Sequence, residues 1–319
     1  MKIFVLLIIA SSLIFTSCSK DEMNVSDEAT SANHPGNRHC ATMEVLEKQL
    51  QEDPSLSARM NEIEAFTNFV QAQRLLPDGT IEIPVVVNVL YKTSAQNISL
   101  SQIQSQINVL NADFAATNAD YNNTPSIFQN VRSGNIGITF VLDQVVRKAT
   151  TKSSWNTNDA MKKSSQGGIN PTSASTKLNM WVCNMGGGIL GYAQFPGGSL
   201  STDGVVVDDN AFGNTGTVTS PYHKGRTATH EVGHWMNLRH IWGDATCGSD
   251  QVSDTPTHNT ANYGCPGYPH YSTCSGSPVE MTMNYMDYTY DICMYMFSAG
   301  QKTRMKAVFA PGGPRNSFA

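Results

Sequence analysis

The chain has 319 residues, of which 40% are hydrophobic and 15% charged, and its formal net charge at pH 7 is −5. This length and composition suffice for one sizeable hydrophobic core, with residues left over for a leader and a pro-segment. The mildly acidic balance, without any basic cluster, argues against a nucleic acid as partner. No segment recurs at a fixed period, so a repeat architecture is not expected.

The first residues have the pattern of an export signal. Lys2 precedes an apolar run over residues 3–15, which is too short to span a bilayer. The run ends in Phe15-Thr-Ser-Cys18, which resembles a bacterial lipobox, so residues 1–18 are interpreted as a signal peptide and Cys18 as a lipidated residue. The alternative is ordinary signal-peptide cleavage nearby. We therefore expect an exported protein, held at the outer membrane or cell surface by a lipid anchor or secreted, with no other membrane contact.

A polar tether and two short helices are predicted next. Residues 20–38 are polar and lack periodicity. Thr42 could cap a helix that runs to Leu50, and a second amphipathic helix follows between Leu56 and Arg74.

Strands and helices then alternate along the chain. Residues 81–91 are β-rich and apolar on both faces, as in a buried strand. Ser99 and Gln102 have the spacing of a capping box before a helix. Further strands are predicted from apolar patterns over 136–142, 177–183 and 204–207. This order indicates a mixed α/β upper lobe, with an irregular lower lobe after Asn237. A last helix should begin at the Ser298-to-Gln301 box and stop before Pro311.

Residues 230–240, His-Glu-Val-Gly-His-Trp-Met-Asn-Leu-Arg-His, indicate the chemistry. His230 and His234 are one helical turn apart, so both imidazoles project from the same face and can bind one metal ion. His240 lies six residues further on, so the helix must end before this third imidazole can join them. Three neutral imidazoles with one open position are typical of a catalytic zinc. Glu231 has the length to take a proton from water at that metal, which indicates a hydrolase.

This spacing resembles the His-Glu-x-x-His-x-x-Gly-x-x-His motif of the metzincin metallopeptidases, with Asn237 in place of the glycine. Asn tolerates a positive φ better than most residues, so the departure is mild. Downstream, Met283-Asn-Tyr-Met-Asp-Tyr288 resembles the metzincin Met-turn. The resemblance implies that Met286 forms an apolar floor beneath the zinc and that Tyr288 donates a hydrogen bond to the reaction intermediate. Alone, Met286 could equally be an ordinary core methionine.

Three further strings narrow the resemblance to the compact bacterial members of the pappalysin family: His-Ile-Trp-Gly-Asp244, Cys247-Gly-Ser-Asp-Gln-Val-Ser-Asp-Thr-Pro256 and Asp291-Ile-Cys-Met-Tyr-Met-Phe297. The resemblance runs from about Ile83 to Met305. It implies an α/β (α+β) zincin fold and a zinc-dependent endopeptidase that acts on proteins or peptides, and we expect a monomer. Residues 191–196 resemble the edge strand that lines the metzincin cleft, with which an extended peptide can pair.

The resemblance also assigns the cysteines. Arg38-His-Cys-Ala-Thr42 is similar to the pro-segment motif in which a cysteine blocks the zinc, which implies that Cys40 is a latency switch. Residues 19–60, or up to about 75, would then be a tether and inhibitory pro-segment, and 61–319 the catalytic domain. Arg59 and Arg74 are candidate cleavage sites. Implied disulfides join Cys247 with Cys274 and Cys265 with Cys293. Cys183 would stay a buried free thiol, unless it pairs with Cys40.

A calcium site is also implied by the resemblance, with Asp250, Thr255 and the backbone carbonyls of Ser249 and Val252 as ligands. The alternative is a solvated acidic loop in which the Asp side chains shape turns.

Substrate preference stays open. Some bacterial relatives select a basic residue after the scissile bond through an acid beside the cysteine beyond the Met-turn. Ile292 occupies that position here, and Asp291 lies one residue earlier.

Two other functions compete with a peptidase. One is a surface lipoprotein that binds a host or matrix protein on a retired peptidase scaffold, which the intact Glu231 and three histidines argue against. The other is a structural zinc protein, which would need a fourth protein ligand.

Overall fold

The structure is a computed structural model that describes residues 37–318. The predictions for Cys18, the signal peptide and the tether up to residue 36 lie outside these residues. Within the described part, no helix combines the length and the apolar composition needed to cross a bilayer. The helices are α1 (Thr42–Glu52), α2 (Ser55–Gln73), α3 (Leu100–Ala115), α4 (Arg226–Trp235) and α5 (Ala299–Ala307), and the strands are β1 (Ile81–Tyr91), β2 (Ile138–Ala149), β3 (Leu178–Cys183), β4 (Gly191–Ala193), β5 (Val205–Asp208), β6 (Tyr263–Gly264) and β7 (Tyr288–Thr289).

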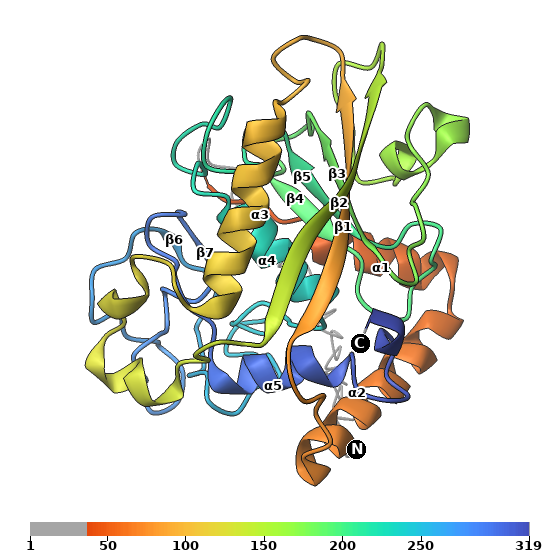
Figure 1. The fold of residues 1–319 in the computed structure, drawn as a ribbon. Coiled ribbons are helices and arrows are strands. Elements are labelled where there is room, and N and C mark those ends of the chain that lie inside the picture. Colours follow the sequence, from red (N-terminus) through yellow and green to blue (C-terminus); the bar gives the residue numbers. More distant parts are fainter. Residues whose placement is uncertain (1–36, 319) are drawn as a thin grey trace, which may run out of the picture. The chain divides into compact units, whose positions relative to one another are not determined.

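A five-stranded sheet in the order β2-β1-β3-β5-β4 forms the centre of the fold (Figure 1). β1, β2, β3 and β5 are parallel, and β4 is an antiparallel edge strand beside β5. α3 packs on β2, and α4 packs on β4 and β5 and against α3. The mixed α/β class and the predicted edge strand are confirmed. We call β1–β5 with α3 and α4 the sheet region.

Both faces of the sheet are covered, which explains the continuous apolar run of β1. Val85, Val87 and Val89 join the main core, which also contains residues of α3 and α4. Leu90 of β1 joins a second buried cluster that includes Trp181. A strand covered on both faces has no solvent side on which polar residues would alternate.

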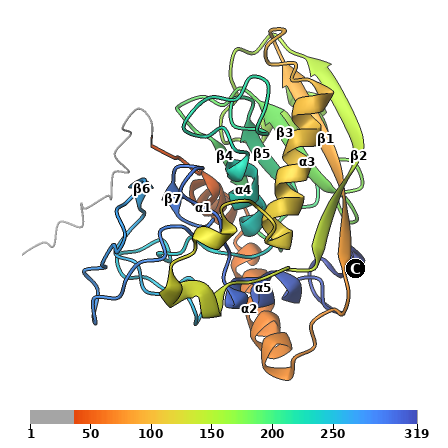
Figure 2. The ribbon, with the colours of Figure 1, turned by 60° about the vertical axis from the view of Figure 1, so that its left-hand side comes forward.

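Residues 241–297 contain little regular structure, and we call them the loop region. Its only strands are β6 and β7, of two residues each, which lie among loops in Figure 2. The disulfides Cys247–Cys274 and Cys265–Cys293 cross-link it, which confirms both implied pairings. An irregular segment after Asn237 was predicted and is confirmed.

The two helices before β1 form as predicted, but one capping assignment is wrong. The N-cap of α1 is Ala41, and Thr42 is the first helical residue, so its hydroxyl does not cap the helix. α2 contacts α5, where Val70 packs with Ala307 and Ala310. The capping box of Ser298 and Gln301 is present at the start of α5.

Candidate active site

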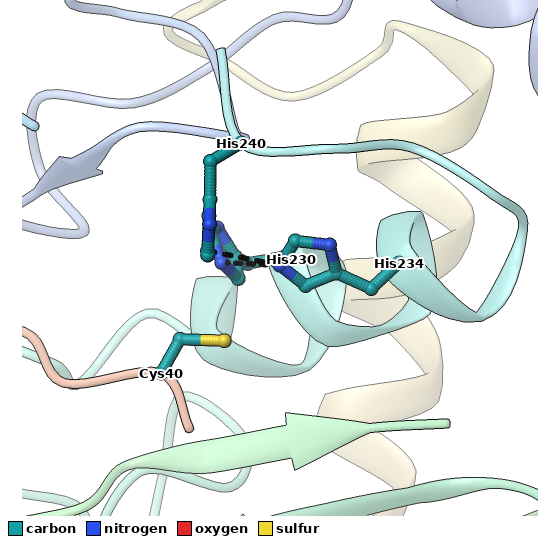
Figure 3. A group of neighbouring side chains, drawn as sticks. All are labelled: Cys40, His230, His234 and His240. Atoms are coloured by element: carbon teal, nitrogen blue, oxygen red, sulfur yellow. Dashed lines mark hydrogen bonds between the residues drawn. The ribbon is translucent and has the colours of Figure 1, made fainter. Parts of the chain in front are cut away.

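Three imidazoles meet at the C-terminal end of α4 (Figure 3). α4 ends at Trp235, and Asn237 adopts a φ of +71°, which turns the chain back toward the helix. This turn brings His240 to the two histidines of α4, as the spacing required. The Nε2 atom of His234 lies 3.1 Å from Nε2 of His230 and 3.1 Å from Nε2 of His240.

Each imidazole is oriented by a contact of its other ring nitrogen. The Nδ1 atoms lie beside oxygens of Tyr285 (backbone, 2.7 Å from His230), Leu238 (backbone, 2.8 Å from His234) and Asp244 (carboxylate, 2.5 Å from His240). An Nδ1–H donated in this way leaves the lone pair of Nε2 directed at the shared point. Burial and the neighbouring His240 lower the pKa of His234 to about 3, so this ring is neutral and able to bind a metal.

Cys40 completes a set of four ligand atoms that lie within 4.8 Å of one another. It belongs to an extended segment that pairs in parallel with β4, where the Ala41 amide donates to the carbonyl of Gly191 at 3.0 Å. Figure 3 shows the thiol directed at the imidazoles. Three imidazoles and one thiol are a donor set that suits tetrahedral zinc, so the residues present fit this metal.

Glu231 lies beside this group and is 1% exposed. Its Oε2 accepts hydrogen bonds from the Cys40 thiol at 3.3 Å and from the Thr42 hydroxyl at 3.0 Å. Burial raises the pKa of Glu231 to about 7, although these hydrogen bonds act in the opposite direction. Thr42 also accepts from the amide of Ala193 in β4 at 2.8 Å. The sequence analysis assigned Thr42 to a helix cap and missed this position, whose only signal was a hydroxyl two residues after Cys40.

Met286 and Tyr288 lie against the zinc motif from the loop region. A Cβ atom on Gly233 would lie 2.5 Å from the sulfur of Met286, so the methionine packs directly on α4 where a side chain is missing. The Tyr288 hydroxyl donates to the carbonyl of Cys40 at 3.0 Å. Its ring centroid is 4.9 Å from that of His240.

Arg38, two residues before Cys40, is 2% exposed, and we call the residues that contact its guanidinium the Arg38 pocket. It donates to Asp291 Oδ1 at 2.5 Å and to the hydroxyl of Thr227 at 3.1 Å. The Arg38 guanidinium also lies over the ring of Tyr222, 5.0 Å from its centroid. Asp291 is therefore directed at the site, whereas Ile292 is 49% exposed. The sequence analysis named Arg38 only as the start of the Cys40 motif, without predicting its contacts, and did not identify Thr227.

The acidic loop brings some of the implied calcium ligands together. The Thr255 hydroxyl lies 2.9 Å from Asp250 Oδ2 and 2.9 Å from the carbonyl of Val252. Burial raises the pKa of Asp250 to about 6. Ser249 uses its hydroxyl locally, as acceptor for the amide of Gln251. Asp254 of the same loop instead accepts hydrogen bonds at the start of α5, from the Ser298 hydroxyl at 2.6 Å and from the Gly300 amide at 2.7 Å.

Among the described cysteines, Cys40 and Cys183 are free, and both are buried. Cys183 lies in the second buried cluster, with Trp181 and Tyr192, whereas Cys40 lies at the imidazoles. The alternative disulfide between Cys40 and Cys183 is therefore wrong in this structure.

Comparisons with known proteins show what the chain is similar to. The peptidase M43 family model, described as pregnancy-associated plasma protein-A, matches residues 177–310. An extracellular metalloprotease of Arthroderma benhamiae is 32% identical over 235 residues, which cover 70% of this chain and 76% of the relative. Extracellular metalloprotease 1 of Coccidioides posadasii is 30% identical over 292 residues, which cover 88% and 92%.

Solved structures give the same result. A promirolysin variant of Tannerella forsythia matches with a TM-score of 0.82 and 43% identity, and covers 88% of this chain and 97% of its own. Mature mirolysin of Tannerella forsythia in complex with a cleaved peptide matches with a TM-score of 0.73 and 47% identity, and covers 76% and 96%.

Proposed function

The chain belongs to the pappalysin family of zinc-dependent metzincin metalloproteases, and from this premise we propose that it is an endopeptidase exported as a latent zymogen. The observation that carries the proposal is the convergence of three imidazoles beside a buried Glu231, with the thiol of Cys40 as a fourth donor. This makes a retired binding lipoprotein the weaker alternative, because a binding scaffold has no physical need for these groups.

His230, His234 and His240 would hold the zinc, with Cys40 as the fourth ligand of the zymogen. When bound, zinc supplies the Lewis acidity that activates water and polarises a peptide carbonyl. Glu231 would accept the proton of the attacking water and deliver it to the leaving amine.

Tyr288 and Met286 would support this reaction from the loop region. The Tyr288 hydroxyl donates to the carbonyl of Cys40, and after the pro-segment leaves it would donate to the oxygen of the peptide under attack. Met286 would keep α4 and its two histidines in place by filling the space beside Gly233.

The pro-segment would extend to about residue 75 rather than to residue 60, because α2 runs without a break from Ser55 to Gln73. The promirolysin match covers 12% more of this chain than the mature mirolysin match, which is about 38 residues. That length corresponds to α1 and α2 with their flanking residues. Cleavage near Arg74, which is exposed at the end of α2, would release both helices together.

The contacts of Arg38 support a preference for substrates with a basic side chain. A buried carboxylate, a hydroxyl and an aromatic face surround its guanidinium, which is the chemistry that selects arginine. Once the pro-segment leaves, the same pocket would accept an arginine or lysine of the substrate. Asp291 would therefore serve as the selecting acid, one residue before the position expected from the family.

Export is supported by the names of the relatives, which are extracellular metalloproteases. A lipid on Cys18 is a finer proposal, which mass spectrometry of the mature N-terminus would test. Calcium binding at Asp250, Val252 and Thr255 is a further proposal. It predicts that calcium raises the melting temperature of the wild type and not of Asp250→Asn.

The test of the peptidase proposal uses the zinc content and casein digestion of the cleaved chain, with and without a chelator. We expect one zinc per chain and hydrolysis that chelation removes and zinc restores. The uncleaved chain should bind zinc equally and digest casein slowly. Hydrolysis that survives complete removal of the metal would contradict the proposal.

A further inference from the structure

Arg226, the first residue of α4, donates to the loop that forms the floor of the Arg38 pocket. Its Nη1 lies 3.0 Å from the carbonyl oxygen of Asp291 and 2.5 Å from that of Met294. The side chains of the same two residues contact Arg38, with Asp291 Oδ1 at 2.5 Å and Met294 Sδ at 3.6 Å from its Nη2. Residues 291–294 therefore lie between two guanidinium groups, one inside the pocket and one behind it.

The position of Arg226 is itself fixed by carboxylates. Asp120 accepts from both of its terminal nitrogens, at 2.7 and 2.8 Å, and Asp113 of α3 lies 3.4 Å from Nη2. The backbone amides of Arg226 and Lys224 donate to Asp291 Oδ2, at 3.3 and 2.8 Å. A planar guanidinium holds several acceptors at fixed angles, which an ammonium group cannot do.

We propose that Arg226 is a positioning residue for substrate selection. Arg226 holds the backbone carbonyls of Asp291 and Met294. It thereby fixes the positions of the Asp291 carboxylate and the Met294 sulfur, which would contact a basic side chain of the substrate. Arg226 itself does not contact the substrate. The inference rests on the proposed preference for a basic residue and deepens it. It matters because hydrogen bonds weaken steeply when distance or angle departs from the optimum.

The experiment compares Arg226→Lys with Arg315→Lys in the cleaved, zinc-loaded enzyme. Arg315 is a matched control: it is also buried, binds Asp203 through two nitrogens at 2.8 and 2.9 Å, and donates to the carbonyl of Trp235, the last residue of α4. Both substitutions weaken contacts at one end of α4. Of the two arginines, Arg226 alone contacts residues 291–294.

The readout is kcat and KM for two peptides that differ only in an Arg or Leu after the scissile bond. Arg226→Lys should raise KM for the Arg peptide about tenfold, the effect of misplacing one charge-assisted hydrogen bond, while kcat changes less than about threefold. Cleavage of the Leu peptide should fall by less than about threefold, because a Leu side chain forms no charge-assisted hydrogen bond with Asp291. Inhibition of Leu-peptide cleavage by argininamide should weaken by a similar factor. Arg315→Lys should leave the ratio of kcat/KM for the Arg peptide to kcat/KM for the Leu peptide, the Arg-to-Leu ratio, unchanged.

An unchanged Arg-to-Leu ratio in Arg226→Lys, with equal losses on both peptides, would assign the residue a purely structural role. If Arg226→Lys does not fold, Asp120→Asn provides a second test. It weakens the ion pair that orients the Arg226 guanidinium and should also lower the Arg-to-Leu ratio. A wild-type enzyme without any preference for Arg over Leu would overturn the basic pocket and this inference together. A wild-type preference that neither variant lowers would overturn this inference alone.

Discussion

Backbone ladders and apolar side chains order the sheet region, where all 11 residues of β1 pair with β2 and Val85, Val86 and Val87 have no exposed surface. In the loop region the only ladder joins two strands of two residues each. Two disulfides and buried polar contacts order this region instead. The site takes its three imidazoles from α4 and the following turn, and Asp291 and Met294 of the Arg38 pocket from the loop region. A rigid scaffold can thus carry a pocket whose residues are free to differ between relatives.

Asp287 illustrates how the loop region is held without a ladder. Its Oδ1 accepts from the amides of Asn262 and Tyr288, each at 2.8 Å, and it has no exposed surface. The side chain of Asn262 then reaches Glu280 at 2.7 Å. Buried polar groups that are fully paired in this way specify one arrangement of the chain.

The largest predicted effect lies in the sheet region, at Glu231. Glu231→Ala should lower casein hydrolysis by at least about 100-fold, because proton transfer by a positioned base contributes this much or more. Zinc content should stay at one per chain, since the three imidazoles are unchanged. Glu82→Ala on β1, a residue that is exposed, is the control and should retain full activity. Residual activity above about one per cent of wild type would assign the base to another group.

In the loop region, the strongest effect is expected on stability. Replacing Cys247 and Cys274 together with serine should lower the free energy of unfolding by about 2–5 kcal/mol, because the disulfide closes a loop in a region with few other constraints. Cys183→Ala in the sheet region should cost only about 1 kcal/mol, the price of a small cavity. Denaturant unfolding measures both values. Equal losses would mean that the two regions do not differ in what stabilises them.

The segment before α1, residues 38–41, contacts both the sheet region and the loop region. Two substitutions remove these contacts one at a time. Cys40→Ala removes the contact with the imidazoles, and Arg38→Ala removes the ion pair with Asp291 in the loop region. We expect Cys40→Ala to raise the activity of the uncleaved chain about tenfold, which corresponds to about 1.4 kcal/mol of lost binding. Arg38→Ala should raise it less, because the Cys40 thiol would still lie at the imidazoles and block the proposed metal. A fluorogenic peptide assay on cleavage-resistant Arg74→Ala protein measures this, and equal activities of all variants would argue against latency through Cys40.

Much of the sheet region could be predicted from the sequence, because burial of both faces of a strand leaves a continuous apolar run and burial of one helix face leaves a periodic stripe. The bounds of β1 were predicted from such a run, and the turn that presents His240 was predicted from the six-residue spacing between His234 and His240. The loop region offered no such pattern, and only the resemblance to a family indicated its disulfides. The direction of the Asp291 side chain could not be read from its position in the chain, since it depends on the amides of residues 224 and 226. Thr42 was misassigned because a hydroxyl at the start of a helix usually caps it.

The smallest predicted effect is a difference in pH dependence between the regions. Burial raises the pKa of Asp208, at the end of β5, to about 6 and that of Asp287 to about 7. Because the folded state binds these protons more tightly than the unfolded chain, the stabilisation is complete below about pH 4 and is lost as pH rises through the folded pKa. Asp287→Asn should therefore gain stability relative to wild type up to about pH 7. The gain of Asp208→Asn should level off near pH 6.

Thermal unfolding of both variants between pH 5 and pH 7 tests this prediction, with the wild type measured in parallel so that all other titrating groups cancel. The lower limit avoids His258, which lies 3.5 Å from Asp287 and whose pKa burial lowers to about 4. Between pH 5 and pH 7 the expected relative change is about 1 kcal/mol for Asp208→Asn and about 2 kcal/mol for Asp287→Asn, so the two regions should differ by about 1 kcal/mol. Parallel curves for wild type and Asp287→Asn would mean that Asp287 stays ionised in the folded protein. The contacts that Asp287 makes in the loop region would then involve a buried negative charge. Electrostatic attraction would contribute more to the order of this region than neutral hydrogen bonds do.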